Sequence, residues 1–398
     1  MVERERPFSS PSGALTGAAF LMAVSAIGPG FLTQTTQFTV TLGASLAFAI
    51  LVSVLIDIGA QLNTWRIIGV SRRRGHEIAD AVIPGLGKLV TAVIVFGSFA
   101  FNIGNISGCA LGMKALFDLN QSVGAAGSAA IAILLFARPK MLRSVDWVSK
   151  LLGAAMILMT GYIVLLARPP VGQVIRQAVY PDQVDVTSII TLVGGTIGGY
   201  IMFSGAHRLL DGGIHGVENL GRISRASVQG ILITGLMRVV VFLAVFGVVQ
   251  SGAQISREAP VFDAFRAGAG SVGHVLSGLV FWSAAITSVV GCSYTSMTFV
   301  PILRDQTRRS RGTIVFILLT AGTTIALNYL GWKPTPLLIL AGTVNGILMP
   351  VVFGVILLAS RRRDIVGDYA HPWWAMAMGF VAWLTTILMA YHTIANIL

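Results

Sequence analysis

A Gly-Pro-Gly triplet at residues 28–30 interrupts an apolar stretch and is followed directly by hydroxyl and amide side chains. Proline removes a backbone donor and clashes with the preceding helical turn, and glycine adds conformational freedom, so Gly28, Pro29 and Gly30 predict a helix break. At membrane depth, unwound backbone is tolerated only where it is buried in protein or lines a polar cavity. The break therefore predicts a site that binds a solute through hydrogen bonds. The side chains that would contribute are Thr33, Gln34 and Thr35.

A second weak point lies at residues 194–205, where clustered glycines interrupt an apolar run that also holds Tyr200 and Ser204. Membrane helices carry many glycines for close packing, and this alternative stays open for the segment taken alone. Interrupted spans at matching positions in two halves of a chain are typical of secondary transporters, whose site lies between them. The N–H groups at such helix starts favour an anion or the oxygen of a carboxyl or amide group.

Two titratable side chains lie within or at the end of apolar runs. Asp57 falls inside the run 51–59, and an intramembrane carboxylate is a functional candidate because it is expensive to bury. It either links transport to a proton gradient or pairs structurally within its span. His207 ends the next broken run and is a proton-carrier candidate because imidazole titrates near neutral pH. Its alternative is a solvated histidine, or one paired with Asp211, at the cytoplasmic end.

Asn102 and Asn105 are three residues apart in the apolar run 89–116 and so share one helix face. They either line one wall of a solute pathway or form hydrogen bonds between helices. The sequence has no cluster of His and Cys with zinc spacing, no phosphate-binding glycine loop and no nucleophile elbow. We therefore expect neither an enzyme nor a bound cofactor or metal.

The elements that carry these residues are membrane helices. Of the 398 residues, 55% are hydrophobic and 11% are charged, so the sequence predicts an all-α integral membrane protein embedded in a lipid bilayer. Apolar runs of spanning length predict about eleven transmembrane helices. They are expected at 15–45 (broken), 46–66, 89–116, 122–137, 147–167, 187–206 (broken), 228–250, 272–299, 313–331, 336–359 and 373–397.

The net charge of +12 suggests at first a partner such as nucleic acid. The arginines and lysines instead fall on alternate loops, after the second, fourth, sixth, eighth and tenth predicted spans. This is the pattern of the positive-inside rule, and it places the N-terminus in the cytoplasm. We therefore expect a multi-pass protein of the inner (plasma) membrane and no nucleic-acid partner.

The two breaks lie five spans apart, and an odd offset places two five-span units in opposite orientations. The sequence thus predicts one transmembrane transporter domain over residues 1–398. Its inverted repeats are expected at approximately 15–167 and 187–359, with an extra helix at 373–397.

Several stretches resemble the NRAMP (natural resistance-associated macrophage protein) family of divalent-metal transporters. Residues 74–79, Arg-Gly-His-Glu-Ile-Ala, are similar to the family's Gly-Lys-Asp-Leu-Ala-Glu loop. Residues 102–117 follow, without a gap, the family's Asp-Leu-Ala-Glu-Val-Ile-Gly-Ser-Ala-Ile-Ala-Leu-Asn-Leu-Leu-Phe helix. Gly278-Leu and the run 283–291 look like a Gly-Leu, Ala-rich, Ser/Thr-Val-Val-Gly helix of the family. The resemblance implies a leucine-transporter-type fold with a 5+5 inverted repeat and broken helices 1 and 6.

The chain departs from the family at the residues that bind metal there. The family's Asp-Pro-Gly-Asn break reads Gly-Pro-Gly-Phe at residues 28–31, and its Met-Pro-His break corresponds to Gly199-Tyr-Ile. The acid pair that the family associates with proton movement becomes Asn102 and Asn105, which favours the pathway interpretation of these two residues. The resemblance therefore implies a divergent branch without the usual metal-binding motif.

A desolvated divalent cation needs carboxylates or soft ligands, and a neutral pocket supplies neither. The sequence therefore favours a proton-linked secondary transporter that works by alternating access. Its expected solute is small and polar or anionic, such as a carboxylate, bicarbonate or a lactam acid like 5-oxoproline. One alternative is a carrier of Mg²⁺ or Mn²⁺ with a non-standard site. Another is a solute channel or receptor on the same scaffold.

Overall fold

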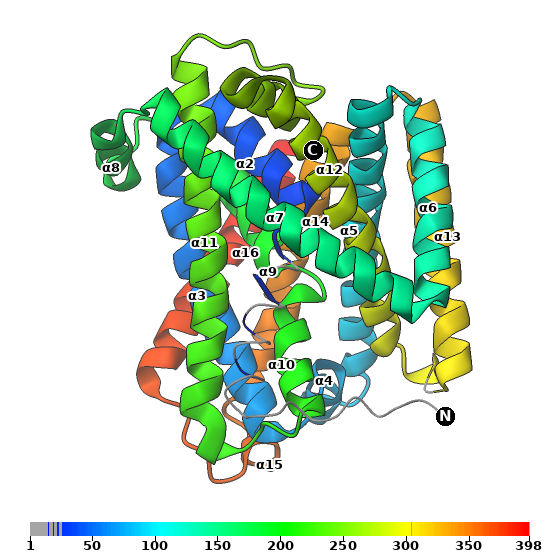
Figure 1. Ribbon diagram of the computed structural model, residues 1–398. Coiled ribbons are helices and arrows are strands. Elements are labelled where there is room, and N and C mark those ends of the chain that lie inside the picture. The colour runs from blue at the N-terminus through cyan, green and yellow to red at the C-terminus, as the bar shows by residue number, and fades with distance from the viewer. Residues whose placement is uncertain (1–14, 16–18, 20–21, 24–25, 304, 398) are drawn as a thin grey trace.

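The computed structural model describes residues 15, 19, 22, 23, 26–303 and 305–397, and these form helices joined by short connections (Figure 1). The described part of the first predicted helix before its break is limited to scattered positions, and the predicted cytoplasmic N-terminus lies outside the described residues. From the first break onward the helices are α2 (Pro29–Leu42), α3 (Leu46–Ser71), α4 (Gly75–Val82), α5 (Leu86–Phe117), α6 (Gln121–Ala137) and α7 (Pro139–Ala167).

The second half of the chain repeats this pattern of long helices with short connections. Its helices are α8 (Val171–Val179), α9 (Val186–Ile197), α10 (Ile201–Asp211), α11 (Leu220–Gln250), α12 (Pro260–Thr298), α13 (Gln306–Tyr329), α14 (Pro334–Ala359), α15 (Arg363–Val366) and α16 (Trp373–Ile397). Short 3₁₀ turns occupy Gly43–Ser45, Val217–Asn219 and Pro301–Leu303.

Among the described residues, eight helical stretches are long and apolar enough to cross a membrane, or nine if the bent pair α7–α8 counts as one span. Helices α2 and α3 run together as one such stretch, and α6 is a shorter apolar helix. The predicted all-α membrane fold is confirmed. Several helices extend beyond their predicted spans: α11 begins at Leu220 rather than 228, because backbone hydrogen bonding continues into polar turns that hydropathy leaves out.

Helices α7 and α8 meet at an angle of 105°. Between them, Arg168 adopts a positive φ of 43° and is followed by Pro169 and Pro170. Prolines lack the donor that would continue the helix and restrict the residue before them, so the chain turns sharply here. In Figure 1, α8 projects from the body of the protein at one end of the helices.

A close glycine contact joins α9 to α14. A Cβ atom added to Gly194 would overlap the backbone of Gly342 and Gly346. Small residues let membrane helices approach until their backbones touch. We call Gly194, Gly342 and Gly346 the glycine contact, which holds the first half of broken helix 6 against α14.

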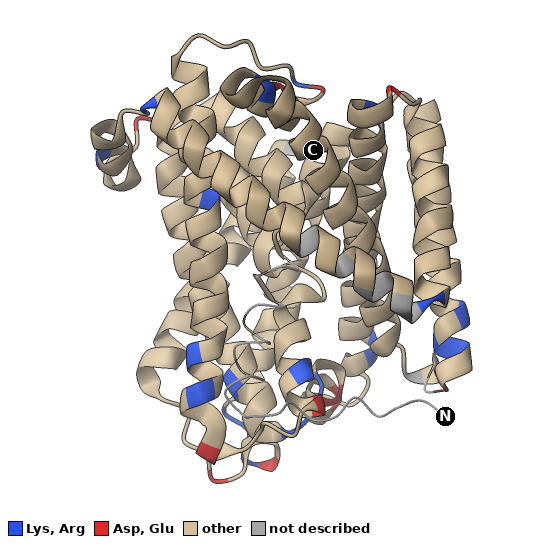
Figure 2. Ribbon diagram, in the orientation of Figure 1, with Lys and Arg blue, Asp and Glu red and all other residues tan. Residues whose placement is uncertain are grey.

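Charged residues gather at the ends of the helices. Figure 2 shows most of the lysines and arginines at the end that carries α4 and α15, opposite α8. We call these two ends the basic end and the α8 end. The long middle of the molecule is largely free of charge in this view, as expected for a multi-pass membrane protein.

Candidate functional site

The two predicted breaks are present. Gly28 is the N-cap of α2 in an extended conformation (φ −117°, ψ −171°), and Pro29 occupies the first helical turn. Gly28 has no side chain to cap the first N–H groups of α2. The second break spans Gly198 to Tyr200, between the end of α9 and the start of α10. Gly199 there has a φ of +59°, which glycine adopts at little cost.

A small cavity lies between the breaks and is closed by α5, α12 and α14. It encloses about 20 Å³, which is about the room that one water molecule needs. Its lining comes mainly from glycine backbone, aromatic rings and uncharged polar side chains. The residues on which the argument rests are Gly28, Gly30, Phe31, Asn105, Tyr200 and Ser288.

Four of the predicted site residues therefore meet at this cavity: Gly28, Gly30, Asn105 and Tyr200. Pro29 instead packs against α5, since a Cβ added to Gly108 would lie 2.6 Å from the Cβ of Pro29. Gly199 lies beside the cavity, and its backbone approaches the side chain of Asn345. The breaks thus bring α2 and α10 to one point, with α5 closing it.

Gln34 lies one turn further along α2 and is fully buried. Its Nε2 donates to the Leu338 carbonyl at 3.2 Å, and its side chain fits between Gly195 of α9 and Gly342 of α14. Its Oε1 has no hydrogen-bond partner. A buried acceptor without a partner costs roughly 1–3 kcal/mol, so this oxygen is a place where a solute, an ion or a water would be stabilised.

The other predicted hydroxyls are mostly engaged within the protein. Thr35 donates to the Phe31 carbonyl at 2.8 Å, and Ser204 donates to the Ile201 carbonyl at 2.9 Å. Thr33 is buried and its hydroxyl has no partner. None of the three lines the cavity as it stands.

The two asparagines of α5 have different surroundings. Asn105 lines the cavity. Asn102 donates from Nδ2 to the hydroxyls of Ser293 and Thr320, at 3.1 and 2.9 Å. Asn102 therefore connects α5 to α12 and α13, while its Oδ1 remains without a partner.

His207 lies on α10 toward the basic end, in contact with Phe203 and Phe299. Its Nε2 accepts a hydrogen bond from the Gly75 backbone N–H at 3.2 Å. Nearby, Trp65 of α3 donates to the Met202 carbonyl at 3.1 Å. These contacts hold α10 against α3 and the start of α4. A role of His207 in proton coupling stays a prediction.

Sequence reasoning missed one charged residue, Arg238 in the middle of α11. It is only 2% exposed. Its guanidinium lies 4.5 Å from the centre of the Phe31 ring, and its Nη1 donates to the Leu192 carbonyl at 3.3 Å. The charge of Arg238 also acts on Asp57 of α3, which is 1% exposed. The rule that singled out Asp57, an ionisable residue inside an apolar run, would also have found Arg238.

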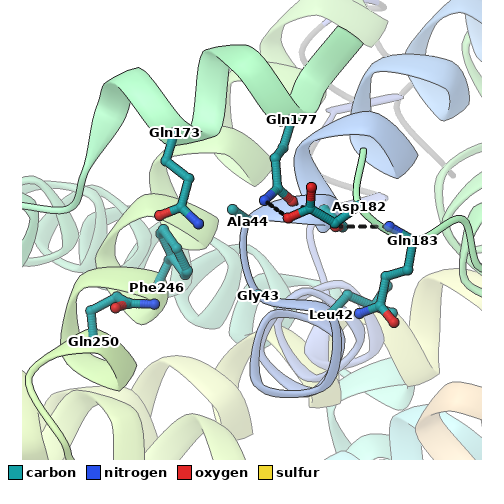
Figure 3. Close-up of a pocket in the computed structure, with 10 residues that line it drawn as sticks. Leu42, Gly43, Ala44, Gln173, Gln177, Asp182, Gln183, Phe246 and Gln250 are labelled. Carbon is teal, nitrogen blue, oxygen red and sulfur yellow. Dashed lines mark hydrogen bonds between the residues drawn. The ribbon is translucent and has the colours of Figure 1, made fainter. Parts of the chain in front are cut away.

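A larger hollow of about 310 Å³ lies at the α8 end (Figure 3). It is lined by polar side chains, including Gln173, Gln177 and Asp182. Ser45 donates to Gln177 Oε1 at 2.6 Å, and Gln177 donates to Asp182, as the dashed line in Figure 3 shows. These groups satisfy one another, so they fasten α8 to the end of α2.

Within the part of the chain that the structure describes, no group of three or more His, Cys, Asp or Glu side chains is placed to hold a metal ion. Beside its aromatic and aliphatic side chains, the cavity offers glycine backbone, the Asn105 amide and the hydroxyls of Tyr200 and Ser288. Such groups suit a solute held by hydrogen bonds.

Solved structures show the type of fold. The chain is similar to the Eremococcus coleocola manganese transporter in complex with an aromatic bis-isothiourea substituted compound, with a TM-score of 0.77 and 17% identity over 99% of this chain and 89% of that one. It is also similar to MhsT in complex with L-phenylalanine, with a TM-score of 0.66 and 14% identity over 96% of this chain and 98% of that one. The fold is thus the leucine-transporter type found in membrane transporters.

The sequence then gives the family. A family profile described as "Natural resistance-associated macrophage protein-like" matches residues 19–397, so the chain belongs to the Nramp family, and the resemblance seen in the sequence is confirmed. Nramp proteins are transporters rather than enzymes, which supports the expected non-enzyme role.

The chain is similar to two membrane proteins over nearly its whole length and to a metal transporter over about half of it. The chain is 46% identical to the "Uncharacterized membrane protein YcsG" of Bacillus subtilis over 96% of this chain and 94% of that one. It is 47% identical to an "Uncharacterized membrane protein" of Haemophilus influenzae over 95% and 94% of the two chains. The "Divalent metal cation transporter MntH" of Lacticaseibacillus casei is 27% identical over 48% of this chain and 42% of its own.

Proposed function

We propose that this protein is a secondary transporter that carries a small polar or anionic solute by alternating access, linked to protons. The observation that carries the proposal is the cavity between the two breaks. It is lined by glycine backbone, Asn105, Tyr200 and Ser288 and contains no carboxylate among its lining residues. Helix starts and neutral donors favour an anion or a carbonyl oxygen over a desolvated cation.

The size of the cavity supports alternating access. About 20 Å³ admits no organic solute, so binding requires the helices around the breaks to separate. The hydrogen bonds of Trp65 and His207 hold α10 in place, so opening toward the basic end would require these bonds to break. By the positive-inside rule, we place that end and the N-terminus in the cytoplasm, and the protein in the plasma membrane.

Proton linkage is proposed for Asp57 and His207. Asp57 is a buried acid beside a buried cation. His207 holds α10 to the start of α4 through its Nε2, and protonation of that nitrogen would break the hydrogen bond. Either group would therefore couple a proton to a change in the protein.

A second candidate is a carrier of a divalent cation. It is supported by the partial similarity to MntH and by the fold shared with a manganese transporter. Gln34 Oε1 and the carbonyl oxygens near the breaks would serve as ligands, as a partly hydrated Mg²⁺ accepts. This candidate predicts saturable metal binding that weakens in Gln34→Leu.

The test is binding to the purified chain by calorimetry, with Mn²⁺, Mg²⁺, lactate, bicarbonate and 5-oxoproline as probes. The proposal expects saturable binding of at least one anion and no saturable response to metal. Uptake of that anion into proteoliposomes should then show counterflow and rise with an inward proton gradient. Metal binding without anion binding would overturn the proposal, and flux that does not saturate would indicate a channel.

A further inference from the structure

The buried guanidinium of Arg238 has unused hydrogen-bonding capacity. Nη1 donates to the Leu192 carbonyl at 3.3 Å, whereas Nε and Nη2 have no partner. A charge this deep in a membrane protein is expensive and marks a functional position by default. The two free nitrogens are the neighbouring pair along one edge of the guanidinium. That edge presents two parallel N–H groups, which is the geometry that holds a carboxylate through two hydrogen bonds.

Phe31 separates this cation from the cavity. Its ring lines the cavity, and the guanidinium of Arg238 lies 4.5 Å from the centre of the same ring. Phe31 stands on the first turn of α2, directly after the break at Gly28. Figure 1 shows α11, which carries Arg238, running beside α2 and α3. A displacement of one ring would therefore both enlarge the cavity and expose the cation to it.

Asp57 balances the charge of Arg238. The two groups interact electrostatically, and both face α9, Arg238 at Leu192 and Asp57 at Thr196. The Thr196 hydroxyl of α9 faces Asp57 and donates its own proton to the Leu192 carbonyl at 2.8 Å. This hydroxyl is therefore left as an acceptor for Asp57, and a protonated carboxyl group is the form that can donate to it. Among the described residues, the charge that acts on Asp57 is that of Arg238.

We propose that Arg238 binds the carboxylate of the transported solute, and that the Phe31 side chain is the gate between Arg238 and the cavity. The substrate class is then a small monocarboxylate. With Asp57 ionised, the empty pair is neutral, and an arriving carboxylate adds one negative charge. Uptake of one proton by Asp57 from the aqueous phase restores neutrality, so one proton accompanies one carboxylate. This inference rests on the proposed function, since it assigns the solute of the same cavity.

The test uses the full-length chain in proteoliposomes with radiolabelled lactate and 5-oxoproline as probes. The main variant combines Arg238→Gln with Asp57→Asn. It removes both buried charges together, so that neither is left in the protein without the opposite charge. The control is Arg222→Gln, an exposed arginine on the same helix. We expect the double variant to fold, as judged by thermal shift, and to lose at least tenfold in carboxylate uptake. The control should match the parent.

The single variant Asp57→Asn provides a second readout. It keeps Arg238 and should still bind the carboxylate, but its binding should no longer depend on pH between 5 and 8. In the parent, a pH-sensitive dye inside the vesicles should record one proton per carboxylate. These two measurements remain informative if the double variant does not fold.

The possible results distinguish the roles of Arg238 and Asp57 from the proposed anion transport on which these roles rest. Carboxylate uptake by the double variant within about twofold of the parent would overturn the role of Arg238 and leave the anion transporter standing. A proton count other than one, or unchanged pH dependence in Asp57→Asn, would overturn the role of Asp57. A parent that takes up neither probe and binds Mn²⁺ would overturn both proposals.

Discussion

The central cavity and the hollow at the α8 end both have polar surroundings, but they differ in whether the hydrogen-bonding atoms have partners. At the α8 end, Ser45, Gln177 and Asp182 bond to one another. Around the cavity, Gln34 Oε1 and two nitrogens of Arg238 have no partner although they are buried. The polar groups of the larger hollow thus bond to one another, whereas polar atoms near the smaller cavity have no hydrogen-bond partner and could bind a solute. Volume alone would favour the hollow at the α8 end, whereas the buried polar atoms without partners favour the central cavity.

The largest effect should come from the packing behind the cavity. Gly194→Val would drive its side chain into the backbone of Gly342 and Gly346, and neither can give way without moving a helix. We expect a loss of stability of about 3 kcal/mol or more, measured as a lower midpoint of thermal unfolding in detergent. Gly127→Val on α6, which faces open space, is the control. Equal stability of the two variants would contradict the glycine contact.

Two glutamines, one near the central cavity and one in the hollow at the α8 end, test which of the two regions binds the solute. Gln34→Leu removes the free oxygen beside the cavity, and Gln173→Leu removes an amide from the hollow at the α8 end. We expect the first to lower the initial rate of uptake by about tenfold, as for a hydrogen bond worth about 1.5 kcal/mol. The second should change it by less than about twofold. A reversed order would move the solute site to the α8 end.

The network at the α8 end should matter for stability rather than transport. Asp182→Asn weakens the hydrogen bond that Asp182 accepts from Gln177, near the attachment of α8. We expect a loss of about 0.5–1 kcal/mol because the group is exposed to solvent. Thermal unfolding and uptake measured on the same preparation would show this. A large fall in uptake at unchanged stability would show that this region takes part in transport.

Stability should also depend on pH through a third region, the loop before α16. Burial, and then the charges of Arg66 and Arg361, lower the pKa of His371 from 6.5 to about 4. Between these values the unfolded chain binds the proton and the folded chain does not, so stability is present above pH 6.5 and falls as the pH drops toward 4. With a half-exposed ring, we expect about 1 kcal/mol at most.

The variant His371→Gln isolates this loop from the cavity. Its unfolding midpoint should fall less than that of the parent between pH 7 and pH 5. A parent whose midpoint is unchanged over this range would contradict the assignment. Any pH dependence of uptake that remains in the variant then belongs to the central region.

Much of the architecture could be predicted from the sequence, because hydropathy and backbone chemistry act locally. Pro29 and the glycines around it specify a break whatever surrounds them, and Gly199 does the same in helix 6. The length of α11 could not be predicted in this way, because its first turns are polar and continue the helix beyond the apolar run.

The site was harder to predict, because the direction of a polar side chain depends on neighbours that are distant in sequence. Asn102 and Asn105 share a helix face, yet Asn102 bonds to α12 and α13 while Asn105 lines the cavity. Arg238 was missed because averaging over the run 228–250 conceals one charge among many apolar residues. Arg238 comes near the cavity through its contact with the Phe31 ring, and Phe31 is 207 positions away in the chain.

The glycine contact between α9 and α14 also limits how the protein moves. Two helices whose backbones touch cannot slide past each other, because a small shift brings each chain against the next turn of its neighbour. Helix α9 must therefore travel with α14 as one rigid part. The backbone enters α10 from α9 through Gly198, Gly199 and Tyr200. Because Gly199 already adopts a positive φ of 59°, rotation of the backbone at this break is the motion that would let α10 turn relative to α9 and α14.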